Sequence, residues 1–234
     1  MAGLGEIMES WSATLARALD LEELSGATES EKPRLQLIQR YVSFLLSVFC
    51  VFWGVEITTH VYVVFLTHWG CILTALYFTL VLTAYGYPKV GPVAYVLYET
   101  TTVLETLICL LFWLTVYPFV DLHVIFIYTL SVHAGLLLLL LLDYPFNRIR
   151  FRLRHFWMSI LVLALYLVMY IPVAFLIRPI YPFVTFTDVG TVVVLAVAFL
   201  MVFGGHWLGV KADQYKYRNT TVAQRFELGP ILKS

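Results

Sequence analysis

The sequence predicts an all-α protein: a six-span transmembrane helical bundle preceded by an interfacial amphipathic helix. Of the 234 residues, 61% are hydrophobic and only 13% are charged, which is about half the charged share of a soluble domain. The mean hydropathy is +0.84, and the apolar residues gather in runs of about 20. A chain of this length cannot bury so much apolar surface in one core, so lipid must cover the remainder.

The apolar runs are expected to cross the bilayer as helices, because hydrocarbon offers the backbone no hydrogen-bonding partner. Proline and glycine separate several runs, as in residues 86–92. The predicted spans are residues 39–59, 62–86, 93–117, 122–143, 156–177 and 187–210. The expected domains are therefore an N-terminal tail (1–38), the transmembrane domain (39–210) and a C-terminal polar tail (211–234).

Residues 3–24 are predicted to form the amphipathic helix. Leu4, Ile7, Trp11 and Leu15 recur at helical spacing, and acidic residues such as Glu6 lie opposite them. Such a helix is expected to lie on the membrane or on a neighbouring protein.

Charge predicts the orientation. Every Lys and Arg except Arg178 falls on one side of the six-span topology. The positive-inside rule therefore predicts that both tails face the cytosol or the mitochondrial matrix. The sequence does not identify the organelle. A net charge of zero argues against nucleic acid as a partner. Four arginines between the fourth and fifth spans are expected to contact lipid head groups: Arg148, Arg150, Arg152 and Arg154.

Two ionisable residues are predicted near the middle of the bilayer, where an unpartnered charge is costly. They are Glu105 in the third span and His133 in the fourth, and neighbouring helices would let Glu105 hydrogen-bond to His133. Polar residues share one face of the third span: Tyr95, Tyr98, Thr102, Glu105 and Cys109. This face either borders a cavity or joins helices through hydrogen bonds.

The remaining chemistry is limited. Cys50, Cys71 and Cys109 all lie within spans, at a spacing that suits neither zinc nor a disulfide framework. The sequence contains no Walker loop, no H-E-x-x-H and no G-x-S-x-G motif. We therefore expect no cofactor and no metal, and any reaction must take place within the membrane.

Several short motifs resemble one family of multipass membrane proteins in their order along residues 40–210. They are Phe65-Leu66-Thr67 with His68-Trp69-Gly70, then Phe112-Trp113, His133-Ala134-Gly135, Leu142-Asp143 with the basic loop through His155, and Ile180-Tyr181-Pro182-Phe183. The chain is similar in these motifs to the rolling stone and androgen-induced superfamily. The turn at residues 66–70 and the basic loop are closer to the rolling stone branch, whereas the stretch after His133 differs from the androgen-induced pattern.

The androgen-induced branch implies an integral-membrane hydrolase of fatty acid esters of hydroxy fatty acids that uses a threonine nucleophile and a histidine. By motif, these roles fall on Thr67 and His133, and Glu105 is the candidate third group that orients the histidine. The rolling stone branch implies a multipass protein linked to cell fusion, without assigned chemistry. The predicted spans place Thr67 and His133 about 9 Å apart in depth, and Thr74 lies closer to the depth of His133.

Two main hypotheses follow. The first is an intramembrane lipid ester hydrolase with Thr67, His133 and Glu105 as its site. The second is a non-catalytic accessory or scaffold subunit that binds other membrane proteins through both tails. Transport of a lipid or small molecule along the polar face of the third span is a further alternative. Membrane lipids are expected partners in every case.

Overall fold

The computed structural model describes residues 33–119, 126–147, 149–177, 179–181 and 184–218. Within these ranges the chain is mainly helical and has no strand, and six of its helices are long and apolar enough to cross a membrane. The protein is therefore a multi-pass integral membrane protein, and the predicted all-α bundle is confirmed. The amphipathic helix predicted at residues 3–24 lies outside the described residues.

Six α-helical spans form the bundle, two of them with a π-helical turn. The helices are α2 (Pro33–Thr58), α3 (Leu66–Thr83), α4 (Gly91–Leu111), α5 (Phe126–Leu130), α6 (Leu136–Asp143), α7 (Phe156–Leu176) and α8 (Val189–Arg218). The π-helical turns are η4 (Phe112–Val116), which continues α4, and η7 (Ser131–Gly135), which joins α5 to α6. Short 3₁₀ helices lie at the connections: η2 (Thr59–Val64), η3 (Pro88–Val90), η5 (Tyr117–Phe119) and η8 (Leu153–His155).

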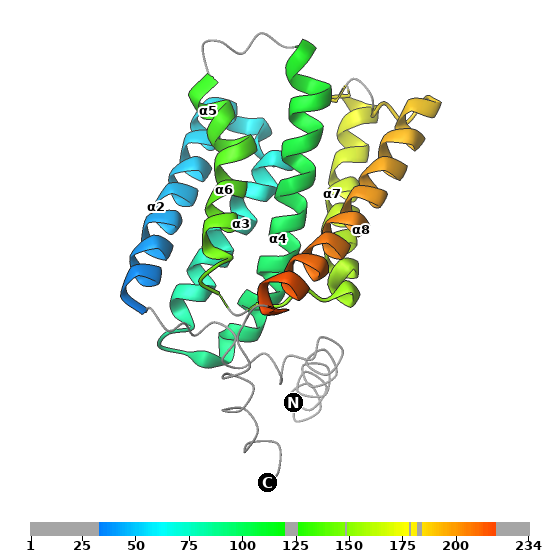
Figure 1. The fold of residues 1–234 in the computed structure, drawn as a ribbon. Coiled ribbons are helices and arrows are strands. Elements are labelled where there is room, and N and C mark those ends of the chain that lie inside the picture. The colour runs from blue at the N-terminus through cyan, green and yellow to red at the C-terminus, as the bar shows by residue number, and fades with distance from the viewer. Residues whose placement is uncertain (1–32, 120–125, 148, 178, 182–183, 219–234) are drawn as a thin grey trace, which may run out of the picture.

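Helix α4 is the centre of the bundle. It contacts α3, α6, α7 and α8, and more than half of its membrane-crossing window is buried. Figure 1 shows α2, α3 and the α5–α6 span on one side of α4, and α7 with the slanted α8 on the other. We call the end where α2 begins and α8 finishes the tail end, and the opposite end, where α4 passes into η4, the loop end.

The first and last helices extend beyond the predicted spans, to Pro33 and Arg218, and charged residues near these ends have partners inside the bundle. The guanidinium of Arg40 donates to Asp143, with Nε 2.8 Å from Oδ1, and neither side chain is exposed. Near the end of α8, Asp213 accepts a hydrogen bond of 2.7 Å from the Tyr144 hydroxyl, and the Lys216 ammonium donates to the carbonyl of Tyr144. Hydropathy alone ended the last span before Asp213 and Lys216, whereas the fold gives both of them partners.

The second span begins at Leu66 rather than at residue 62, because the preceding residues form η2. Tyrosines hold this junction. The Leu66 N–H donates to the Tyr181 hydroxyl at 3.1 Å, and the Tyr166 hydroxyl donates to the Val64 carbonyl at 2.9 Å. Burial raises the pKa of Tyr181 to about 12, so this hydroxyl stays neutral. These contacts place Thr67 in the first turn of α3.

Candidate functional site

Thr67 and His133 lie in direct contact near the loop end of the bundle. The Thr67 hydroxyl oxygen is 3.0 Å from Nε2 of His133. Thr67 belongs to the first turn of α3 and is only 8% exposed, whereas His133 lies in η7 and is half-buried. The 9 Å difference in depth expected from the sequence is absent, because that expectation counted residues from the predicted ends of two spans, and these ends need not lie at one level in the bundle.

The second ring nitrogen of His133 defines the tautomer. Its Nδ1 is 2.9 Å from the backbone carbonyl oxygen of Thr129, which can only accept a hydrogen bond. Nδ1 therefore carries the proton, and Nε2 accepts the hydrogen bond that the Thr67 hydroxyl donates. This is the protonation pattern that a hydroxyl nucleophile and its general base require.

The imidazole is also held from the side by an aromatic ring. Phe112 stacks on His133 with ring centroids 3.5 Å apart and an angle of 18° between the planes. Both residues lie in π-helical turns, Phe112 in η4 and His133 in η7, and such turns are frequent at functional sites.

An open apolar groove of about 540 Å³ runs beside the histidine. Its lining comes from the end of α4 and from the α5–α6 span: Cys109, Leu130, Ser131, Ala134, Gly135, Leu137, Leu138 and Leu141. Ser131, Ala134 and Gly135 of this lining belong to η7, the turn that contains His133, whereas His133 and Thr67 do not themselves line the groove.

Glu105 does not take the place expected for it. Its Oε1 accepts a hydrogen bond of 3.2 Å from the Thr74 hydroxyl, while Thr129 occupies Nδ1 of His133. The hydrogen bond predicted between Glu105 and His133 is thus wrong, and so is Thr74 as a competing partner of the histidine. The reason is local: a backbone carbonyl one turn before His133 reaches the ring, and Glu105 faces α3 instead.

Sequence analysis missed a second hydroxyl–imidazole pair near the tail end. The Ser159 hydroxyl on α7 is 2.9 Å from Nε2 of His206 on α8, and neither side chain is exposed. Nδ1 of His206 lies 4.0 Å from Oε2 of Glu99, and His155 contacts the other oxygen of this carboxylate at 3.0 Å. This pair could have been found from the sequence, because burying an ionisable side chain in a membrane span is costly, and this argument applies to His206 as much as to His133.

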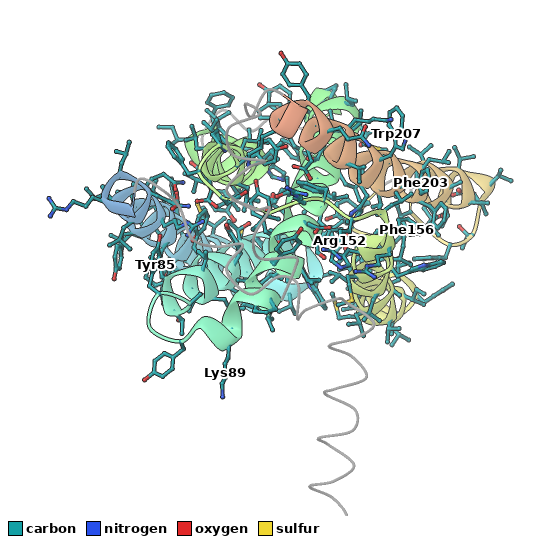
Figure 2. The ribbon with its side chains drawn as sticks, turned by 60° about the horizontal axis from the view of Figure 1, so that its bottom comes forward. Tyr85, Lys89, Arg152, Phe156, Phe203 and Trp207 are labelled. Carbon is teal, nitrogen blue, oxygen red and sulfur yellow. The ribbon has the colours of Figure 1, made fainter. Side chains whose placement is uncertain are left out.

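The predicted head-group arginines belong to a segment held by buried side chains. Arg150 and Arg154 are exposed and Arg152 is half-buried, whereas Arg148 lies outside the described residues. The Arg150 N–H donates to the Tyr95 hydroxyl at 2.7 Å, and the Arg152 N–H donates to Glu99 Oε2 at 3.0 Å. Figure 2, which looks toward this end, shows Arg152 near the middle of the bundle and Lys89 at its edge. The predicted contact with lipid head groups stays a prediction.

The polar face predicted on the third span is buried against other helices. Tyr95, Tyr98, Thr102 and Glu105 are all less than a tenth exposed. The three cysteines are free thiols, of which Cys50 and Cys71 are buried. Among the residues that the structure describes, no group of three or more His, Cys, Asp or Glu side chains is arranged to hold a metal ion.

Comparison with known proteins adds no relative: no family model, no curated protein and no solved structure matches the chain. The chemistry must therefore be inferred from the geometry. A hydroxyl donating to an imidazole of defined tautomer, beside an apolar groove in a membrane, can transfer an acyl group from a lipid ester.

Proposed function

We propose that the protein is an intramembrane hydrolase of fatty acid esters, with Thr67 as the nucleophile and His133 as the general base. The observation that carries this proposal is the hydrogen bond of 3.0 Å from the Thr67 hydroxyl to Nε2 of His133. The defined tautomer supports it, because Nε2 is free of its own proton and can accept the one on Thr67.

The reaction would proceed in two steps. His133 Nε2 takes the hydroxyl proton, Thr67 Oγ1 attacks the ester carbonyl carbon, and the alcohol leaves with the proton returned by His133. Water then attacks the acyl-threonine, loses a proton to Nε2, and the released Thr67 oxygen takes that proton back. The Thr129 carbonyl orients the ring, which is the role that a carboxylate has in many hydrolases.

The groove supports an acyl chain as the substrate part next to the site, since its lining is mostly leucine and alanine. The motifs shared with the rolling stone and androgen-induced superfamily support the same class. We include membership of that superfamily in the proposal, with esters of hydroxy fatty acids as the preferred substrates.

The experiment compares purified wild-type protein with Thr67→Ala and His133→Ala in ester hydrolysis. Removing a general base or its nucleophile should reduce kcat about 10²–10⁴-fold. Thr67→Ser should retain activity because it keeps the hydroxyl. Thr79→Val is the matched control, since Thr79 lies on the same helix and its hydroxyl donates to the Ala75 carbonyl.

A fluorophosphonate ester provides a covalent readout, because it should label Thr67 in the wild type and in Thr79→Val but not in His133→Ala. Equal hydrolysis by the wild type and both alanine variants would refute the hydrolase. The accessory-subunit alternative would then remain.

A further inference from the structure

Three consecutive threonines near the middle of α4 lack the hydrogen bond that five other threonines make to their own helix. In α2, α3, α4 and η4, threonine hydroxyls donate to the carbonyl four residues earlier, as they do at Thr58, Thr79, Thr83, Thr106 and Thr115. Thr100, Thr101 and Thr102 are 3%, 0% and 8% exposed, yet none of these hydroxyls has a hydrogen-bond partner among the described residues. These hydroxyls are buried donors that the helix itself leaves unpaired.

Glu105 lies on the same side of α4, since it follows Thr101 by four residues and Thr102 by three. Its side chain is fully buried. Oε1 accepts the Thr74 hydroxyl, but Oε2 has no partner in the part of the chain that the structure describes. Three unpaired polar atoms therefore lie within one turn of a single helix face.

The carboxyl of Glu105 presses against α3 at Gly70. A Cβ atom at Gly70 would lie 2.5 Å from Oε1, so only glycine permits this close approach. Gly70 follows Thr67 by three residues, and side chains at that spacing are about 5–6 Å apart on a helix. The carboxyl of Glu105 therefore contacts α3 one turn from Thr67.

Buried polar groups without a protein partner are usually satisfied by internal water, which makes two to four hydrogen bonds to them. We infer that Thr101, Thr102 and Glu105 form a site for internal water between α4 and α3. In the chemistry of the proposed function, on which this second part rests, that water is the one that attacks the acyl-threonine.

Hydrolysis of the acyl-threonine requires only the water, His133 and Thr67. The water oxygen bonds to the acyl carbon, its proton passes to Nε2 of His133, the bond from that carbon to Thr67 Oγ1 breaks, and His133 returns the proton to Thr67. The products are the fatty acid and the free threonine. Cys109, one turn beyond Glu105 on α4, lines the acyl groove, so the same helix contributes to the water site and to the groove.

The water site is tested first by hydroxyl-radical footprinting with X-rays, which oxidises side chains next to bound water. Cys71 is the reporter, because its thiol is fully buried and it directly follows Gly70, which the Glu105 carboxyl contacts. We expect oxidation of Cys71 in the wild type and its loss in Glu105→Leu and in the double variant Thr101→Val, Thr102→Val. Thr106→Val is the control, since that hydroxyl already donates to Thr102.

An unmodified Cys71 in the wild type, or equal oxidation in a folded double variant, would overturn the water site. This readout does not depend on hydrolysis, so it remains informative if the proposed function fails.

The role of the water is tested by the mass of the intact protein during ester turnover. The double variant should release one alcohol per protein at the wild-type rate and then stall, with an acyl group accumulating on Thr67. Absence of acyl-threonine from a variant with reduced turnover would refute the hydrolytic role. Failure of the proposed function itself would appear differently, as undiminished hydrolysis in Thr67→Ala.

Discussion

Thr67 with His133 and Ser159 with His206 are similar pairs at opposite ends of one bundle. In each, a hydroxyl oxygen lies within 3.0 Å of Nε2 of a histidine on another helix. The difference lies in the other ring nitrogen. That of His133 donates to a backbone carbonyl, whereas that of His206 has no hydrogen-bond partner among the described residues and is 4.0 Å from Glu99.

Their surroundings differ as well. His133 is half-buried, in a turn that contributes to an open apolar groove. Ser159 and His206 have no exposed surface and lie among aromatic rings, with the ring centroids of Phe156 and His206 6.4 Å apart. Figure 2 shows Phe156 and Phe203 close together on the side of the bundle formed by α7 and α8. A hydrogen bond between a hydroxyl and an imidazole is thus not enough to identify a functional site. The loop-end pair differs from the tail-end pair because it is accessible and because its histidine has a defined tautomer.

The largest expected effect separates the two pairs by activity. His133→Asn should lower kcat/KM for a long-chain ester about 10²–10⁴-fold, because asparagine cannot accept and return a proton. Ser159→Ala should leave kcat/KM unchanged, since we assign that pair to packing. The measurement is initial-rate kinetics in liposomes. Loss of activity in Ser159→Ala with normal folding would reverse the assignment.

A second comparison concerns the two carboxyls of α4, of which Glu99 has many partners and Glu105 has few. Glu99→Leu should lower the free energy of unfolding by about 3–5 kcal/mol, because it leaves His155 and the Arg152 N–H without their buried acceptor. Glu105→Leu should cost only about 1 kcal/mol, the value of its single hydrogen bond to Thr74.

Equilibrium unfolding in mixed micelles measures both changes. Equal losses of free energy of unfolding in the two variants would mean that Glu105 stabilises the fold as much as Glu99 does. Glu99 and Glu105 would then not differ as a structural carboxyl and a water-binding carboxyl.

These two carboxyls also show how far the sequence predicts the site. Hydropathy was enough to predict the number of spans. The free-energy cost of burying an ionisable group in the membrane identified Glu105 and His133 as candidate site residues. It could not predict the partner of either residue. The contacts of Glu105 with Thr74 and Gly70 depend on how α3 and α4 pack. The bond from His133 to the Thr129 carbonyl depends on the rotamer of the ring within its own span. The close contact of Thr67 with His133 likewise depends on how α3 packs against the span that contains η7, which hydropathy does not report.

The ends of the helices illustrate the same limit. Asp213 lies beyond the predicted end of the last span at residue 210, although it has a hydrogen-bond partner 69 residues away, the hydroxyl of Tyr144. Charge composition therefore underestimates a span whenever tertiary contacts pair its polar residues.

A smaller effect is expected from the groove beside His133. Ala134→Trp should fill part of it and lower kcat/KM for long-chain esters about tenfold, while a short acetyl ester, which does not need the groove, should be hydrolysed normally. Val168→Trp is the control, because Val168 is 72% exposed on α7. The chain-length profile of the rate is the measurement. A uniform loss on short and long esters would indicate a displaced histidine rather than a blocked acyl site.

The smallest expected effect concerns stability. Thr67→Ala and Ser159→Ala each remove one hydrogen bond between helices, and each should lower the free energy of unfolding by about 0.5–1.5 kcal/mol. Thermal unfolding in the same detergent compares them, with Thr79→Val as the reference for a hydroxyl on an exposed helix face. Equal stability costs together with unequal activity would locate the chemistry at the loop end. A cost at Ser159 several times that at Thr67 would mean that His206 depends on this bond to remain buried beside Glu99, which makes the tail-end pair a structural element of the α7–α8 contact.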